Sequence, residues 1–219
     1  MRRFVTNARD AGVSVGAHPG FSDVQGFGRR RIEMAPGEIE DMVLYQIGAL
    51  QAIAQAAGTR VTHVKPHGAL ANIAAEQRSC ADAVSRAVKA ADPNLIMVAL
   101  AGSQQDESAH AFGLRIAREG YADRLYADDG NLASRSVPGA LYHDVDRAVE
   151  QALRMVFARE VITQSGQHVT VQVDTICVHG DGTGAVAIAR ALLAALVGRG
   201  ARVARLDYKR LTAGHQAEK

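Results

Sequence analysis

The chain has 219 residues, of which 47% are hydrophobic and 22% charged, with 25 basic and 23 acidic side chains. This balance excludes wholesale disorder, and a net charge of +2 gives little support to a nucleic-acid or membrane-surface partner. No apolar run approaches the roughly 18–20 residues that span a bilayer, and the first residues lack the apolar core of a secretory signal. The two cysteines resemble neither a disulfide framework nor a zinc cluster, so a cytoplasmic enzyme is expected.

Helix-like and strand-like patterns alternate from the start of the chain. The first half predicts, in order, the end of a helix over 1–11, a strand at 13–17, a helix from Pro36 to near Gly58, a strand at 61–65 and a helix over 75–91. The helix that begins at Pro36 has an apolar residue every three to four positions, which is typical of a helix with one buried face.

The second half continues the same alternation. It predicts a fully apolar strand at 95–100, a helix over 104–112, a strand at 114–117, a loop over 119–143, a helix over 144–158, a hairpin within 161–171, a strand at 174–178, a helix over 184–197 and a last strand at 203–206. Repeated βα units without a linker favour one α/β domain over 1–219, as a β/α barrel or an open doubly wound sheet. Because a helix precedes the first strand, the fold is expected to be incomplete at its N-terminus.

Three polar loops, each directly after an apolar strand, carry a histidine. They contain His18, His67 and His179. The C-terminal ends of parallel strands lie on one face of an α/β protein, so these loops are expected to converge there. Such a gathering of polar side chains amounts to an active-site hypothesis.

The loop after the second of these strands has the strongest chemical signal. Lys65 at the strand end is costly to bury unless it meets an anion, and His67 is suited to proton transfer near neutral pH. His63, two residues before Lys65, is better explained as a structural histidine. In the first loop, Arg29 and the adjacent Arg30 either clamp a carboxylate or phosphate or belong to a solvated turn.

The third loop pairs His179 with a nearby carboxylate, Asp181, which can orient an imidazole and raise its basicity. The glycines that follow do not form a Walker loop, so they carry no prediction of nucleotide binding. Asp123 and Arg124 are either a substrate clamp or a surface pair, and Arg135 is a second candidate for binding an anion.

Six segments together resemble the lactam-utilization (LamB/YcsF) family, whose members are also known as the A subunit of 5-oxoprolinase. The segments are Gly16–Phe21, Gln25–Arg30, Tyr45–Leu50, Val64–Leu70, Tyr121–Arg124 and Asp174–Asp181. The resemblance implies a seven-stranded β/α barrel of the glycoside hydrolase/deacetylase type. It also implies ATP-dependent opening of 5-oxoproline to glutamate, with ATP and Mg²⁺ as cofactors and with subunits B and C as partners.

Members of this family begin with an acidic strand motif, Asp-x-Asn-x-Asp-x-Gly-Glu, followed by Cys-Gly-x-His-Ala-Gly-Asp, and neither occurs here. Met1 aligns with a methionine that is internal in relatives. The expectation is therefore a barrel that lacks one or two N-terminal strands and the acidic side chains they supply.

Lactam opening assigns roles to the residues already singled out. Lys65, with Arg124, would stabilise developing charge, and His67 and His179 would be the acid/base pair, oriented by Asp181 or Asp123. The catalytic set is thus Lys65, His67, His179 and Asp181. The substrate-binding set is His18, Arg29, Asp123, Arg124 and Arg135.

Two alternatives remain open at this stage. In the first, the chain is a metal-dependent deacetylase-like hydrolase with His18, His67 and His179 as ligands, although these histidines lack the short spacing of a strong metal motif. In the second, it is an inactive truncated assembly subunit, and exposed strand edges and apolar surface drive it to form a homo-oligomer or to bind a partner.

Overall fold

The computed structural model describes residues 1–181 and 184–206, which divide into two compact units. The first unit comprises Met1–Ala99, Ser103–Ala117 and the described residues from Arg205; the second comprises Leu100–Gly102 and Arg118–Ala204. Two of the points where the chain passes from one unit to the other fall inside strands, at Ala99–Leu100 and at Ala117–Arg118, rather than in a linker. The single domain predicted over 1–219 stays a prediction.

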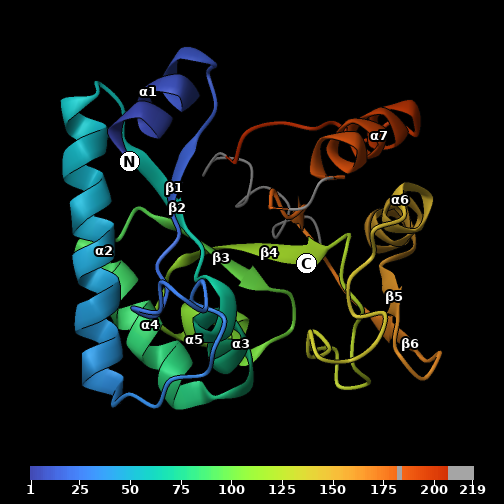
Figure 1. The fold of residues 1–219 in the computed structure, drawn as a ribbon, viewed down its shortest axis with the longest axis horizontal. Helices are drawn as coiled ribbons and strands as arrows, with labels where there is room; N and C mark the ends of the chain where they lie inside the picture. The colour runs from blue at the N-terminus through green and yellow to red at the C-terminus, as the bar shows by residue number, and fades with distance from the viewer. Residues whose placement is uncertain (182–183, 207–219) are drawn as a thin grey trace. The chain divides into compact units, whose positions relative to one another are not determined.

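The first unit alternates short strands with helices (Figure 1). Its elements are α1 (Arg2–Asp10), β1 (Val15–Ala17), α2 (Pro36–Ala56), β2 (Val61–Val64), α3 (Gly68–Glu76), α4 (Arg78–Ala91), β3 (Ile96–Leu100, whose last residue belongs to the second unit) and α5 (Gln104–Ala111). The strands β1, β2 and β3 are parallel and adjacent in that order. The predicted α/β class with parallel strands is confirmed.

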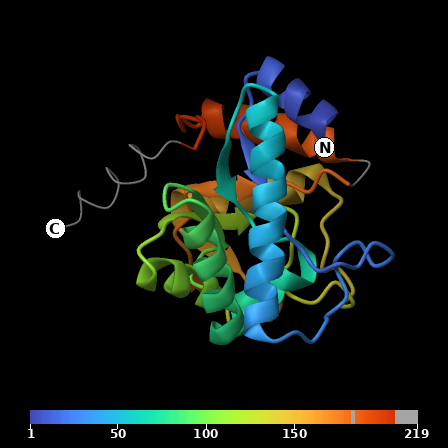
Figure 2. The same cartoon turned by 90° about the vertical axis from the view of Figure 1, so that its left-hand side faces the viewer.

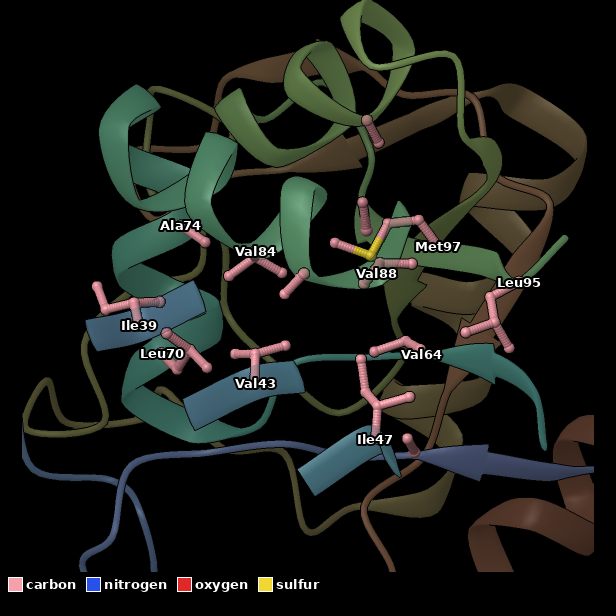
Figure 3. Packing of buried hydrophobic residues seen from close by; sticks show 14 of the residues in the cluster. Ile39, Val43, Ile47, Val64, Leu70, Ala74, Val84, Val88, Leu95 and Met97 are labelled. Carbon is pink, nitrogen blue, oxygen red and sulfur yellow. The ribbon is translucent and has the colours of Figure 1, made fainter. Parts of the chain in front are cut away.

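The apolar stripe predicted for the second helix forms the centre of this unit's core. Val43 and Ile47 of α2 are fully buried and face Val84 and Val88 of α4, with Val64 of β2 beside them (Figure 3). Figure 2 views the unit from the side of α2, which runs along its outside. Fully burying a Val or Ile side chain contributes about 1.5–3 kcal/mol each, so this stripe fixes α2 against the strands.

The second unit has fewer residues in helices and strands than the first. Its elements are β4 (Arg115–Tyr121, which begins in the first unit), α6 (Val145–Leu153), the π-helical turn η1 (Arg154–Ala158), β5 (Glu160–Ile162), β6 (His168–Thr170), β7 (Thr175–Cys177) and α7 (Ala185–Gly198). β4 and β7 pair in parallel, and β5 and β6 form the predicted antiparallel hairpin. Ala148 and Ala152 of α6 pack against Ile188 and Leu192 of α7.

Three predicted elements differ from the structure. The helix expected over 75–91 is found as α4 from Arg78, but a separate helix that was not predicted, α3, precedes it, because Gln77 adopts an extended conformation (φ −120°, ψ 115°) between the two. The loop expected from residue 119 begins later, since β4 runs to Tyr121. The strand expected at 203–206 is absent, and Val203 is 54% exposed, so it has no sheet to pack against.

In the part of the chain that the structure describes, no helix combines the length and apolar character needed to cross a membrane.

The loop between β1 and α2 is closed by one buried carboxylate. Asp23 accepts hydrogen bonds from the backbone N–H of Gly26 (2.9 Å) and from the Arg30 Nε (2.9 Å), and it also pairs with the Arg30 Nη2. The hydrogen bonds and charge of Arg30 lower the pKa of Asp23 to about 2, although desolvation opposes this shift. Arg30 is therefore part of the loop's structure.

This ion pair predicts a pH dependence of stability. Because the pKa of Asp23 is about 2 in the folded chain and 3.8 as its ordinary value, the unfolded chain takes up a proton first as pH falls. The stabilisation is present above pH 3.8 and disappears as pH falls through about 2. In urea denaturation, the unfolding free energy of the wild type should fall more steeply over this window than that of Asp23→Asn. Parallel pH curves for the two proteins would contradict the prediction.

A second prediction concerns the contact between β1 and β2. A Cβ at Gly16 would overlap the Nε2 of His63, whose ring also contacts the Thr62 hydroxyl at 2.9 Å. Gly16→Ala should destabilise the fold by about 1–3 kcal/mol, the usual cost of overpacking.

The matched control is Gly48→Ala. Gly48 lies in the interior of α2, and no atom lies within 4 Å of where its Cβ would be. This change should stabilise the fold by about 0.5–1 kcal/mol. Equal midpoints of chemical denaturation for the two variants would refute the close approach of His63 to β1.

Candidate functional site

Backbone hydrogen bonds continue beyond the ends of β1 and β2 and hold their loops together. The Lys65 N–H donates to the Ala17 carbonyl (2.9 Å), and the His67 N–H donates to the Pro19 carbonyl (2.8 Å). The parallel register of the two strands thus places His18 beside the Lys65–His67 segment. For these two loops the expected meeting of strand ends is confirmed.

The rings of His18 and His67 are in direct contact. His67 Nδ1 lies 3.0 Å from His18 Nε2, and the ring planes are inclined by 69°. Each outer nitrogen has a backbone carbonyl as its partner: His18 Nδ1 lies 2.5 Å from the Lys65 oxygen, and His67 Nε2 lies 2.6 Å from the Phe27 oxygen. Both outer nitrogens must donate, because a carbonyl oxygen only accepts.

The loop that supplies the Phe27 carbonyl has an unusual conformation. Phe27 has φ 55°, a region that bulky residues rarely adopt, and Gly28 follows with φ 66°. A Cβ at Gly28 would lie 2.9 Å from His67 Cδ2. The Phe27 ring packs edge-on against His67 at 5.3 Å, and the Arg29 guanidinium lies over that ring at 5.2 Å. Arg29 is thus brought beside the histidine pair.

Two features of this cluster were not predicted. Gln46 of α2 clamps Gly20, accepting from its N–H (3.1 Å) and donating to its carbonyl (2.8 Å). A glutamine next to the buried Ile47 on the core-facing helix is the signal that would have identified it. The Phe27 carbonyl could not be predicted as a partner of His67, because every residue has a backbone carbonyl and the sequence does not distinguish one from another.

Lys65 lies half-buried at the end of β2, as expected. Burial, and then the positive charge of Lys65, lower the pKa of His63. His63 therefore stays neutral beside Gly16, which agrees with the structural role predicted for it.

A second cluster forms where β4 and β7 end. Tyr121 is the partner of Cys177 in the parallel register, and the Ala122 N–H donates to the Cys177 carbonyl (3.2 Å). Asp123 and His179 lie two residues beyond Tyr121 and Cys177. His179 Nδ1 is 2.8 and 2.9 Å from the two carboxylate oxygens of Asp123. The His179 backbone N–H also donates to Asp123 (3.2 Å).

The Asp123–His179 contact fixes the chemistry of both groups. Asp123 is 7% exposed, and desolvation by itself raises its pKa, but the hydrogen bonds and charge of His179 outweigh burial and lower that pKa. The carboxylate accepts from Nδ1, so Nε2 of a neutral His179 ring carries the lone pair. This arrangement is suited to a general base.

The sequence left open whether Asp181 or Asp123 orients His179, and the structure shows the Asp123 carboxylate in contact with His179 Nδ1. Asp181 is exposed in the loop before α7, and the next two residues, 182 and 183, lie outside the described part of the chain. The sequence did not identify Asp123 as the partner of His179, because the two residues are 56 positions apart.

Arg124 is buried, and its guanidinium holds the loop that follows β4. It donates to the carbonyls of Ala133 (2.6 Å) and Ala140 (3.3 Å), and Gln151 of α6 donates to its backbone carbonyl (2.8 Å). Burial, and then the charge of Arg135, lower the pKa of Arg124. Gln151 was not predicted. Direct contact of Arg124 or Arg135 with a substrate stays a prediction.

The predicted residues thus fall into two sets. His18, Arg29, Lys65 and His67 belong to the first unit, and Asp123, Arg124, Arg135, His179 and Asp181 belong to the second. The convergence of all three histidine loops on one face stays a prediction. Within residues 1–181 and 184–206, no group of three or more His, Cys, Asp or Glu side chains is arranged to hold a metal ion.

Comparisons with known proteins agree on one family. The model of the LamB/YcsF family matches residues 1–210. The A subunit of 5-oxoprolinase from Rhodopseudomonas palustris (strain BisB5) is 51% identical over 204 residues, which cover 93% of this chain and 80% of that protein. The second A-type subunit of 5-oxoprolinase from Bradyrhizobium diazoefficiens is 50% identical with the same coverage. The crystal structure of a lactam utilization protein from Thermus thermophilus shares 44% identity at a TM-score of 0.86, covering 94% of this chain and 82% of that one. The chain belongs to the LamB/YcsF family.

Proposed function

We propose that this protein opens a five-membered lactam, 5-oxoproline or a related ring, in an ATP-dependent reaction as the A subunit of a multi-subunit enzyme. The names of the similar proteins support lactam chemistry and a subunit role. The observation that carries the proposal is the histidine oriented by a buried carboxylate, His179 on Asp123.

Lactam opening makes two demands on protons. A water molecule that attacks the carbonyl carbon must lose a proton, and the ring nitrogen must gain one as the C–N bond breaks. His179, with Nδ1 donating to Asp123, is suited to accept the proton from water at Nε2. His67 is the candidate for donating a proton to the nitrogen.

The reaction also needs positive charge near an anionic substrate. Phosphorylation of the lactam oxygen by ATP, with Mg²⁺, would make the amide carbon electrophilic. Lys65 and Arg29 are the cationic side chains suited to hold phosphate, and His18 lies beside them. The first N–H groups of α3 are less suited, because the Ala69 N–H already donates to the Gly28 carbonyl (2.9 Å). Arg135 is proposed as an anchor for the substrate carboxylate.

The finer features of the assembly belong to the same proposal. We propose a seven-stranded β/α barrel as the complete fold, subunits B and C as partners, self-association into a homo-oligomer and a cytoplasmic location. The word "subunit" in the names of relatives supports partner chains, and the parallel β1-β2-β3 and β4-β7 pairings are compatible with a barrel.

The roles of Lys65 and His67 predict the effect of removing each. Lys65→Ala and His67→Ala should each reduce lactam-dependent ATP hydrolysis, measured with subunits B and C present, by about 10²–10⁴-fold. The matched control is Lys89→Ala, whose ammonium donates to the Phe112 carbonyl on the surface of the first unit. Turnover of Lys65→Ala equal to that of Lys89→Ala would contradict the assignment.

The orientation of His179 predicts a difference between two aspartates. Asp123→Asn removes the charge and the acceptor pair at Nδ1, so kcat should fall by about 10²–10⁴-fold while the far-UV spectrum is unchanged. Asp181→Asn is the control, and its kcat should remain within a few-fold of the wild type. If Asp181→Asn is the more damaged variant, Asp123 is not the orienting carboxylate.

A further inference from the structure

The contact between His18 and His67 restricts where the protons of both rings can lie. The two outer nitrogens are occupied by carbonyl oxygens, at 2.5 Å for His18 and 2.6 Å for His67. The two inner nitrogens, His18 Nε2 and His67 Nδ1, face each other at 3.0 Å. All four ring nitrogens therefore have a defined partner.

Counting protons leads to a contradiction if both rings are neutral. A neutral imidazole has one N–H, and the carbonyl partners require that it lie on the outer nitrogen of each ring. Both inner nitrogens would then present lone pairs to each other at hydrogen-bond distance, which is repulsive. One additional proton between them turns this repulsion into an N–H···N hydrogen bond.

We propose that His18 and His67 share one proton and act as a single acid–base unit with a charge of +1. Charge-assisted hydrogen bonds are stronger than neutral ones, so the two carbonyls and the inner contact all favour the charged pair. His18 is exposed, which leaves water free to solvate the charge.

The charged groups around the pair oppose the added proton or are already paired. Lys65, at the end of β2, and Arg29, over the Phe27 ring, are positive and oppose the added proton. His63, earlier on β2, is held neutral by burial and by Lys65. Asp23 in the same loop is paired with Arg30. The geometric requirement of the two carbonyls must therefore outweigh the nearby cations, and this is what the experiment tests.

A metal ion between the two inner nitrogens is the competing explanation. Such an ion would use both inner nitrogens as ligands, so zinc binding that depends on His18 distinguishes it from a shared proton. Within the described residues, no third His, Cys, Asp or Glu joins the pair to complete a metal site. A shared proton, by contrast, needs only the two facing nitrogens.

The catalytic consequence rests on the proposed function. When the lactam C–N bond breaks, its electron pair stays on nitrogen, and the proton held by the pair is transferred from His67 to that nitrogen. The pair is left neutral, with two lone pairs in contact, and therefore readily takes up another proton from the solvent, while His179 releases to the solvent the proton it accepted from the attacking water. His18 acts through His67 and is a positioning residue.

Nuclear magnetic resonance of the full chain labelled with ¹⁵N-histidine tests the shared proton directly. At neutral pH, three of the four ring nitrogens of the pair should carry protons, two of them on the outer nitrogens and one in a low-field bridging signal. His18→Ala should abolish the bridging signal and leave His67 Nδ1 without a proton, whereas His110→Ala, a change at an exposed histidine of α5, should leave it intact. Two bare inner nitrogens in the wild type would overturn the proposal. So would one equivalent of added Zn²⁺ that binds the wild type but not His18→Ala.

Activity separates this proposal from the proposed function. In the enzyme with subunits B and C, His18→Ala should lower kcat by about 10²-fold with little change in the KM for lactam. Imidazole added to the buffer should restore part of that rate, which a purely structural role would not allow. If the bridging signal is present but His18→Ala turns over at the wild-type rate, the relay is wrong. If the wild type opens no lactam, the proposed function fails and the shared proton stands on its spectrum.

Discussion

The parallel pairing of strands is the constraint on which both clusters depend. In each unit the backbone ladder continues past the last paired residues, through the Lys65 and His67 N–H groups in one case and the Ala122 N–H group in the other. A side chain that follows one strand is therefore held at a fixed distance from the loop of its neighbour. Because the backbone already fixes the positions of the contacting groups, their side chains lose little conformational entropy when the polar contacts form.

The two clusters use that constraint in the same way, with different acceptors. In each, a strand-end histidine directs its Nδ1 toward an oxygen supplied by the neighbouring strand's loop. For His18 the acceptor is the neutral Lys65 carbonyl, and for His179 it is the Asp123 carboxylate. Either acceptor holds the proton of its ring on Nδ1 and leaves Nε2 facing away from it. The second cluster is thus arranged to accept a proton at Nε2 of His179, whereas the first, with its paired rings and nearby cations, is suited to donating a proton and binding an anion.

The sequence was sufficient where one strong pattern decides the outcome. The stripe through Val43 and Ile47 located α2, and the turn residues after Ile162 located the hairpin. It was insufficient where tertiary contacts decide. Nothing local marks Gln77 as the extended residue that separates α3 from α4, and Val203 has strand propensity but lies outside any sheet. In the site, the histidines were predictable by type and position, but their partners were a distant carboxylate and two backbone carbonyls.

The glycines of the first cluster have a packing explanation. Glycine-rich segments at strand ends suggest phosphate-binding loops, in which bare backbone approaches an anion. Here histidine rings occupy the space that a Cβ would need: the His63 ring lies against Gly16 and the His67 ring against Gly28. The close approach also brings the Phe27 carbonyl within reach of His67. The glycines therefore determine where the rings lie, and through the carbonyls they determine which ring nitrogens carry protons.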